Sequence, residues 1–370
     1  MHSSKKIIAV DCFKLVKGEG SSIGIYNYTK NLVQYLSQLD KYKIIIFGNS
    51  LNKVDFDIDG VAFKVIPISI RGKVIYILWE LLFVNYYIFK YNIKLTVFPR
   101  GYLPLFKLSK TINTIHDLIP FYYYQFHRSD INLLENYYIR KRLLSSASKS
   151  DQVICISDYT KKELLNLCPE SKGVTSVIYN GYNKLNYRKY NRNDESYIFS
   201  ISSSRFKHKN LKGLIKAYSC YFLNNENPLY LHLAGVDSID EFNLPIDIAN
   251  HITLYGYLSD EELFHQFSNA KIFLFLSMIE GFGFPPLESM SLGVPVISSN
   301  KTSLREVVGN AGVLVNPGDI QGISSAIVDL DRDYNLREDL IRKGYENVNK
   351  FKWNDMIHKY SDIIDRELEI

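Results

Sequence analysis

Cysteine is scarce in this sequence and shows no paired pattern. The chain has four cysteines, which are Cys12, Cys155, Cys168 and Cys220, and it has no CxxC pair. A zinc site or a disulfide framework needs cysteines at closer and more regular spacing. We therefore expect four reduced thiols in a protein of the cytosol rather than a disulfide-stabilised secreted domain.

No apolar run is long enough to cross a membrane. The most apolar stretch, residues 74–89, is shorter than the roughly 20 residues that a spanning helix needs, and it contains Glu80 and Asn85. It is predicted to be a buried helix. The apolar run after Lys5 and Lys6 is too short for the core of a signal peptide. The sequence therefore predicts a cytoplasmic protein without a spanning helix.

Charge is unevenly distributed along the chain. Residues 1–185 hold 25 Lys and Arg against 14 Asp and Glu, whereas residues 186–370 hold 19 against 25. The first half thus carries +11 and the second −6, and such asymmetry suggests an anionic surface as a partner of the first half. A solvated basic surface is the alternative. Nucleic acid is disfavoured, because the lysines are dispersed and no nucleic-acid-binding signature is present.

Short apolar runs alternate with helical patterns, which is typical of parallel α/β architecture. Strands are predicted at 5–11, 42–48, 111–117, 151–157, 197–202, 229–235, 251–256, 271–277, 295–299 and 312–315. The polar segment 178–197 opens on the turn pair Asn180-Gly181. We expect two doubly wound, Rossmann-like domains, residues 1–183 and 184–352, followed by a terminal helix at 353–370. A length of 370 residues suits two domains.

The segment EGFGFPPLESMSLGVPV, residues 280–296, carries the most specific motif. It follows the end of a predicted strand and opens a helix, which is where open α/β sheets bind ligands. Prolines at 285–286 suit the first helical turn. The backbone N–H groups left unpaired there, those of Phe282, Gly283 and Phe284, can meet a phosphate or a hydroxyl. Glu280 and Glu288 would then bind two polyol parts of one ligand.

This segment resembles the signature of the family 4 retaining glycosyltransferases, which have the two-domain GT-B fold with a cleft between the domains. The resemblance covers nearly the whole chain. Its other elements are the first helix and glycine-rich loop at 21–36, TIHDLIPF at 114–121, segments 155–164 and 177–182, the basic loop at 202–218 and the terminal helix at 351–360. The motifs are specific for the family and say little about the sugar.

The resemblance implies a nucleotide-sugar donor held by the second domain, with GDP-mannose favoured, and an acceptor held by the first. The charge asymmetry favours a glycan acceptor that is linked to a polyprenyl diphosphate. No metal and no cofactor are expected, and DFDID at 55–59 is judged a poor metal motif because it lies in a polar connection. The implied catalytic residues are His116, Arg205, Lys209 and Glu280. The implied ligand-binding residues are Gly24, Asp117, Phe282, Gly283, Phe284 and Glu288.

Each of these residues has an expected role. Arg205 and Lys209 neutralise the departing diphosphate, although His208 competes with Arg205 for that position. Glu280 binds hydroxyls of the donor sugar, and Glu288 binds the ribose. His116 faces the donor sugar from the first domain. Asp117 orients His116 or its loop, and Asn210 caps the helix that follows the basic loop.

Three positions depart from the family pattern. Ser22 and Ile25 replace a glycine and an arginine that the family often has in its first loop, so one cation is missing there. Arg305 stands where a proline often precedes the next glutamate, which leaves the role of Glu306 open. The alternatives are a sugar-nucleotide epimerase or hydrolase of the same architecture, and a non-catalytic carbohydrate-binding relative.

The charge asymmetry predicts reversible attachment to an anionic membrane. Basic residues near such a surface contribute on the order of 1 kcal/mol each. The expected contact set is Lys14, Lys17, Lys30, Lys107 and Lys110, helped by the aromatic stretch 121–126. This predicts a peripheral enzyme at the inner face of the cytoplasmic membrane. An enzyme with a soluble acceptor is the alternative.

Overall fold

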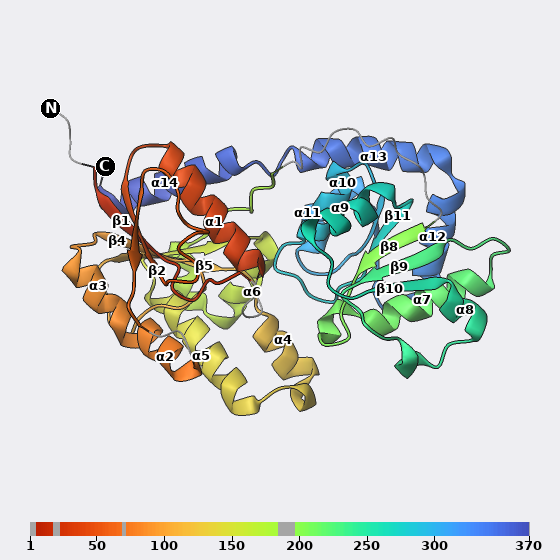
Figure 1. The fold of residues 1–370 in the computed structure, drawn as a ribbon, viewed down its shortest axis with the longest axis horizontal. Helices are drawn as coiled ribbons and strands as arrows, with labels where there is room; N and C mark the ends of the chain where they lie inside the picture. The colour runs from red at the N-terminus through yellow and green to blue at the C-terminus, as the bar shows by residue number, and fades with distance from the viewer. Residues whose placement is uncertain (1–4, 18–22, 69–71, 184–196, 370) are drawn as a thin grey trace. The chain divides into compact units, whose positions relative to one another are not determined.

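The chain folds into two compact α/β units. The computed structural model describes residues 5–17, 23–68, 72–183 and 197–369. The first unit comprises residues 1–181 together with 353–370, and the second comprises residues 182–352. Each unit has its own parallel sheet with helices packed around it (Figure 1). The predicted fold class, two Rossmann-like doubly wound domains, is confirmed.

The first unit contains a seven-stranded parallel sheet in the order β3-β2-β1-β4-β5-β6-β7. Its strands are β1 (Ile7–Asp11), β2 (Lys43–Gly48), β3 (Val61–Val65), β4 (Leu95–Phe98), β5 (Lys110–Ile115), β6 (Gln152–Cys155) and β7 (Thr175–Val177). The chain order reverses between the neighbours β1 and β4. Sequence patterns predicted β1, β2, β5 and β6 but not the short strands β3, β4 and β7.

Helices of the first unit are α1 (Ile23–Gln38), α2 (Lys73–Leu78), α3 (Val84–Lys90), α4 (Ile119–Phe126), α5 (Leu133–Lys149), α6 (Asp158–Leu167) and α14 (Trp353–Leu368). The predicted buried helix at 74–89 is only partly correct. A π-helical turn, η1 (Trp79–Phe83), separates α2 from α3. Only one face is buried, with Trp79 stacked on Phe13 at 4.3 Å. On the other face Phe89 is 79% exposed.

The second unit contains a six-stranded parallel sheet in the order β10-β9-β8-β11-β12-β13. Its strands are β8 (Tyr197–Ile201), β9 (Tyr230–Ala234), β10 (Ile252–Tyr255), β11 (Ile272–Phe275), β12 (Val296–Ser299) and β13 (Val313–Val315), all of which the sequence predicted. Its helices are α7 (Leu211–Leu223), α8 (Ile246–Asn250), α9 (Asp260–Asn269), α10 (Phe284–Ser291), α11 (Leu304–Val308), α12 (Ile320–Arg332) and α13 (Tyr334–Val348). The predicted capping box of Ser259 and Glu262 is present.

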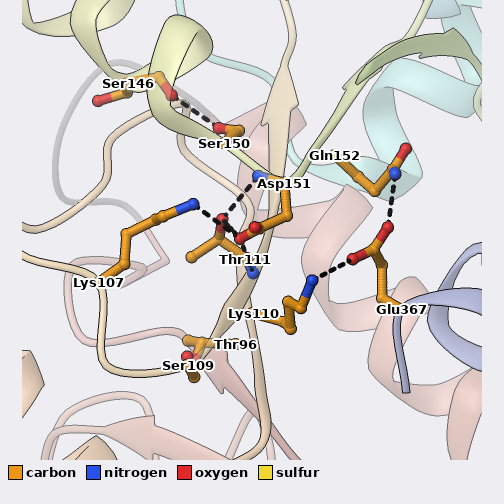
Figure 2. A network of polar contacts seen from close by, with 10 residues as sticks. All are labelled: Thr96, Lys107, Ser109, Lys110, Thr111, Ser146, Ser150, Asp151, Gln152 and Glu367. Carbon is orange, nitrogen blue, oxygen red and sulfur yellow. Dashed lines mark hydrogen bonds and ion pairs between the residues drawn. The ribbon is translucent and has the colours of Figure 1, made fainter. Parts of the chain in front are cut away.

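The terminal helix α14 belongs to the first unit, where it lies beside α1 (Figure 1). Trp353 stacks on Tyr35 of α1 at 5.6 Å. Near the other end of α14, Glu367 accepts a hydrogen bond from Gln152 at 2.6 Å and pairs with Lys110 at 3.4 Å (Figure 2). These contacts fix the last helix to the edge where β5 and β6 begin.

Figure 2 also shows the ion pairs of two lysines that were predicted to contact a membrane, Lys107 and Lys110. Lys107 pairs with Asp151 at 3.0 Å and Lys110 with Glu367, while Lys14 pairs with Glu80 at 2.8 Å. Counted by structural unit, Lys and Arg exceed Asp and Glu by only 7 in the first unit, because residues 353–370 add five carboxylates and only two cations to it. Three of the five lysines expected at a membrane are therefore already neutralised by carboxylates.

Candidate active site

The second unit brings two predicted catalytic residues into direct contact. Strand order reverses between β8 and β11, the position where open α/β sheets bind ligands. Lys209 lies in the loop after β8 and Glu280 in the loop after β11. Lys209 Nζ is 2.7 Å from Glu280 Oε1, and both side chains are partly buried. The pair places a cation and a carboxylate together at the carboxyl edge of this sheet.

Backbone contacts hold Glu280 in place. Its N–H donates to Thr302 Oγ1 at 3.1 Å, and Ser303 Oγ lies 2.8 Å from the carbonyl oxygens of both Glu280 and Phe282. Sequence reasoning missed Thr302 and Ser303. The available signal was the pair of hydroxyl residues just after β12, the next strand in the sheet.

The turn into α10 is fixed by steric constraints. Gly283 has φ +120°, and a Cβ there would lie 2.6 Å from Leu304 Cδ2, so only glycine fits. Prolines occupy the first turn of α10, as predicted. Phe282 is buried, whereas Phe284 is half-buried. The loop is therefore pre-shaped around Glu280 before any ligand binds.

Asn210 does not cap α7, contrary to the prediction. It stands at the N-cap position but in a left-handed conformation, φ 55°, and makes no side-chain cap. A capping residue normally has extended dihedral angles. The Asn210 amide instead donates to the carbonyl oxygens of Leu276 and Pro317, at 3.1 and 3.0 Å. It thereby joins the Lys209 loop to the loops that follow β11 and β13.

Arg205 and His208 differ sharply in accessibility. His208 is 6% exposed, packs near Phe206, and its carbonyl accepts from the N–H of Met278. Arg205 is exposed, and its guanidinium donates to no residue that the structure describes. Of the two, Arg205 is the side chain that an entering diphosphate can reach.

Glu288 is partly buried and lies one turn into α10. Its carboxylate accepts no hydrogen bond from the residues that the structure describes. Burial raises its pKa from 4.5 to about 7, and the charge of Asp260 adds to the shift. Such a carboxylate gains stability from hydroxyl donors, which is the chemistry that a ribose diol offers.

His116 lies directly after β5 in the first unit. Its Nε2 is 2.8 Å from the carbonyl oxygen of Pro99, so Nε2 carries the proton and Nδ1 is left as an acceptor. The Tyr28 ring meets the imidazole edge-to-face at 4.8 Å. The pKa of His116 is lowered from 6.5 to about 4, mainly by burial and in part by the charge of Arg100. His116 is therefore neutral near pH 7.

Two predicted ligand-binding residues of the first unit lie at the starts of helices, Asp117 before α4 and Gly24 in α1. Asp117 Oδ1 accepts from the N–H of Ile119 at 3.0 Å, so it supports the start of α4, one of its two expected roles. Gly24 was expected in a loop but lies in the first turn of α1, where it is exposed and a Cβ would meet no atom within 4 Å. Gly18, Gly20 and Ser22 lie outside the described residues.

The acidic DFDID segment occupies turns between β2 and β3. Asp55, Asp57 and Asp59 therefore do not end a buried strand. Among the described residues, no group of three or more His, Cys, Asp or Glu side chains is arranged to hold a metal.

Glu306 is half-buried on α11. None of the described helices combines the length and the hydropathy that a bilayer span requires.

Two family models match adjoining parts of the sequence. The model "Glycosyltransferase Family 4" matches residues 23–184, and "Glycosyl transferases group 1" matches residues 183–347. Together they account for most of the 370 residues, and their shared edge falls next to the boundary between the two structural units.

Curated relatives and solved structures agree with these matches. The chain is 29% identical over 273 residues to O-antigen chain mannosyltransferase B of Escherichia coli, covering 70% of each chain. It is 28% identical over 244 residues to O-antigen chain mannosyltransferase RfbU of Salmonella typhimurium, covering 65% of this chain and 66% of that one. Sucrose-phosphate synthase from Thermosynechococcus elongatus has the same fold, with a TM-score of 0.77, 18% identity, and 99% and 100% coverage.

Proposed function

Because this chain belongs to the family 4 glycosyltransferases, we propose that it transfers a hexose, mannose from GDP-mannose being favoured, with retention of configuration. The acceptor is a glycan of a bacterial surface polysaccharide, an O-antigen or a capsule. The two mannosyltransferase relatives support the choice of sugar. Since the matched models describe transferases, the epimerase, hydrolase and non-catalytic alternatives are set aside.

The observation that carries this proposal is the ion pair of Lys209 and Glu280 at the carboxyl edge of the second sheet. Lys209, assisted by Arg205, neutralises the departing diphosphate, and Glu280 binds hydroxyls of the donor sugar. Glu280 is not assigned as a nucleophile, because the incoming hydroxyl is proposed to attack on the face from which the diphosphate leaves. The leaving phosphate takes the proton of the incoming hydroxyl.

The donor is tested directly by a binding screen. Thermal shift and donor hydrolysis are measured with GDP-, UDP- and dTDP-linked sugars in EDTA. We expect GDP-mannose to give the largest shift and to be hydrolysed without added metal, since cationic side chains are proposed to handle the diphosphate. If transfer stops in EDTA and returns with magnesium or manganese, the assignment of Lys209 and Arg205 is wrong.

Donor affinity should depend on the protonation of Glu288. A carboxylate accepts two ribose hydroxyls only when it is ionised, and its pKa in the free protein is about 7. We expect donor affinity to fall as the pH drops from 8 to 6, and Glu288→Gln to weaken binding about tenfold at pH 8 and to remove the pH dependence. Calorimetric titration at several pH values measures both. A variant with wild-type donor affinity and collapsed turnover would refute the ribose assignment.

A second readout tests the raised pKa of Glu288 in the free protein. The folded-state pKa of Glu288 lies above the unfolded value, so its contribution to stability is present below about pH 4.5 and is lost as the pH rises through about 7. Glu288→Gln should therefore raise the melting temperature at pH 8 and leave it unchanged at pH 4.5.

The acceptor is proposed to be lipid-linked and reached from the membrane surface. The helix α4 supports this, because none of its residues is buried. Its Tyr124 ring carries the guanidinium groups of Arg140 and Arg128, whose Cζ atoms lie 3.6 and 4.5 Å from the ring centroid. Aromatic and basic groups together suit a headgroup region. We therefore expect the surface of α4, rather than the paired residues Lys14, Lys107 and Lys110, to contact the membrane.

Liposome co-sedimentation tests this surface. We expect binding to rise with anionic lipid and to fall with salt, and Phe126→Ser, on α4, to weaken it severalfold. The control is Tyr257→Ser in the second unit, where the side chain is 87% exposed against 60% for Phe126. Equal sedimentation with neutral and anionic vesicles would remove the membrane assignment.

A further inference from the structure

The first unit has a small pocket lined by charged residues at the edge of its own sheet. Its strand order reverses between β1 and β4, and a pocket opens where these strands end. Asp11 is the last residue of β1, and Arg100 follows the end of β4 by two positions. The other lining residues are Lys14, Trp79, Glu80, Phe98, Pro99 and Tyr102. By the rule that applies to the second unit, this is a binding position.

Most charged groups of the pocket already have partners. Glu80 Oε2 lies 2.8 Å from Lys14 Nζ, and Glu80 Oε1 lies 3.5 Å from Arg142 Nη2. Asp11 Oδ1 accepts from the indole N–H of Trp79 at 3.0 Å and from the N–H of Phe13 at 3.2 Å. These groups are satisfied by one another and form the fixed wall of the pocket.

Arg100 is the exception in this wall. It is half-buried, yet its guanidinium makes no hydrogen bond or ion pair with any residue in the described ranges. It lies close enough to Asp11, Lys14 and His116 for its charge to act on all three. Its neighbour Pro99 provides the carbonyl to which His116 is bonded. A half-buried guanidinium without a hydrogen-bonded partner among the described residues can bind an oxyanion in a bidentate manner.

We propose that Arg100 binds a phosphate or diphosphate group of the acceptor, beside His116. The inference rests on the proposed function, which assigns the acceptor to the first unit. The donor diphosphate is already assigned to Lys209 and Arg205 of the second unit, so this is a separate oxyanion site. The carboxylates of Asp11 and Glu80 already accept hydrogen bonds from Trp79 and Lys14, which leaves Arg100 as the charged group of this pocket that a ligand can engage.

Binding of inorganic pyrophosphate tests the site without an identified acceptor. The full chain is used with Arg205→Ala and Lys209→Ala, which remove the two cations proposed to bind the donor diphosphate. Pyrophosphate is titrated into this variant while the His116 imidazole is followed by NMR. We expect saturable binding that raises the pKa of His116, because the anion offsets the Arg100 charge. Arg100→Gln should weaken binding about 10- to 100-fold and abolish the effect on His116, and Arg100→Lys should restore part of it.

The matched control is Lys94→Gln, which removes an exposed cation just before the amino end of the same strand, β4. Loss of pyrophosphate binding in Lys94→Gln, or unchanged binding in Arg100→Gln, would overturn the proposal. Glucuronate replaces pyrophosphate in a parallel titration, and tighter binding of this carboxylate would contradict a phosphate site.

Steady-state transfer then connects the site to the acceptor. Arg100→Gln should raise the acceptor KM at least tenfold, whereas the control Lys94→Gln should leave it unchanged. Pyrophosphate binding with an unaltered acceptor KM would mean that the site holds free phosphate, which contradicts the acceptor assignment. If the wild-type chain consumes no nucleotide-sugar, the proposed function fails independently, since pyrophosphate binding is measured without a donor.

Discussion

Glycosyl transfer should fall about 10²- to 10³-fold when Glu280 is replaced by alanine. Its carboxylate pairs with Lys209, and its backbone is hydrogen-bonded to Thr302 and Ser303, so the side chain is oriented before the donor arrives. The loss should appear mainly in kcat, because contacts to the transferring sugar strengthen in the transition state. Initial rates at saturating donor measure it, with circular dichroism to confirm folding.

The same unit offers a matched control for this variant. Lys271 and Asp331 form an ion pair of 2.6 Å, whose side chains are 22% and 15% exposed, against 26% and 15% for Lys209 and Glu280. Asp331→Asn removes a carboxylate of the same burial away from the candidate site. We expect it to lower stability and leave kcat unchanged. Activity of Glu280→Ala within twofold of wild type would remove Glu280 from the site.

The second large effect is expected for Lys209→Met. Removal of the ammonium should lower kcat by about 10²-fold or more, because the charge that develops on the diphosphate loses its partner. Lys209 and Glu280 are in contact, so the double variant should lose much less than the product of the two single losses.

A double-mutant cycle in kcat measures this coupling, and Lys271→Met serves as the control of equal burial. Additive losses for Lys209 and Glu280, or an equal loss in Lys271→Met, would show that the ion pair is structural rather than catalytic.

Local patterns were sufficient to predict the fold class, and the family resemblance selected the candidate residues of the second unit, whose roles stay predictions. The apolar strands are short and regularly spaced, and the glutamates of the EGFG segment lie beside a proline turn that fixes its own conformation. The contact of Lys209 with Glu280 follows from topology, because adjacent parallel strands end at the same edge. These features depend on residues close together in sequence or on a regular sheet.

What could not be predicted depends on contacts between distant segments. Lys110 pairs with Glu367, which lies more than 250 positions away in the sequence. The sequence does not show this ion pair, so it could not reveal that Lys110 is already neutralised. Arg100 follows a four-residue strand that no pattern revealed. Asn210 has a common capping residue type, but its left-handed backbone directs the amide to two other loops. Secondary-structure propensity alone does not determine such tertiary contacts.

The most direct test of the account is the stereochemistry of the transfer product. The full chain is incubated with GDP-mannose, EDTA and a polyprenyl-diphosphate-linked glycan, and the one-bond carbon–proton coupling at the new anomeric centre is measured by NMR. The account predicts transfer without metal and an α-linked product from the α-linked donor, lost in Glu280→Ala and kept in Asp331→Asn. A β-linked product, or transfer by Glu280→Ala at the wild-type rate, would contradict it.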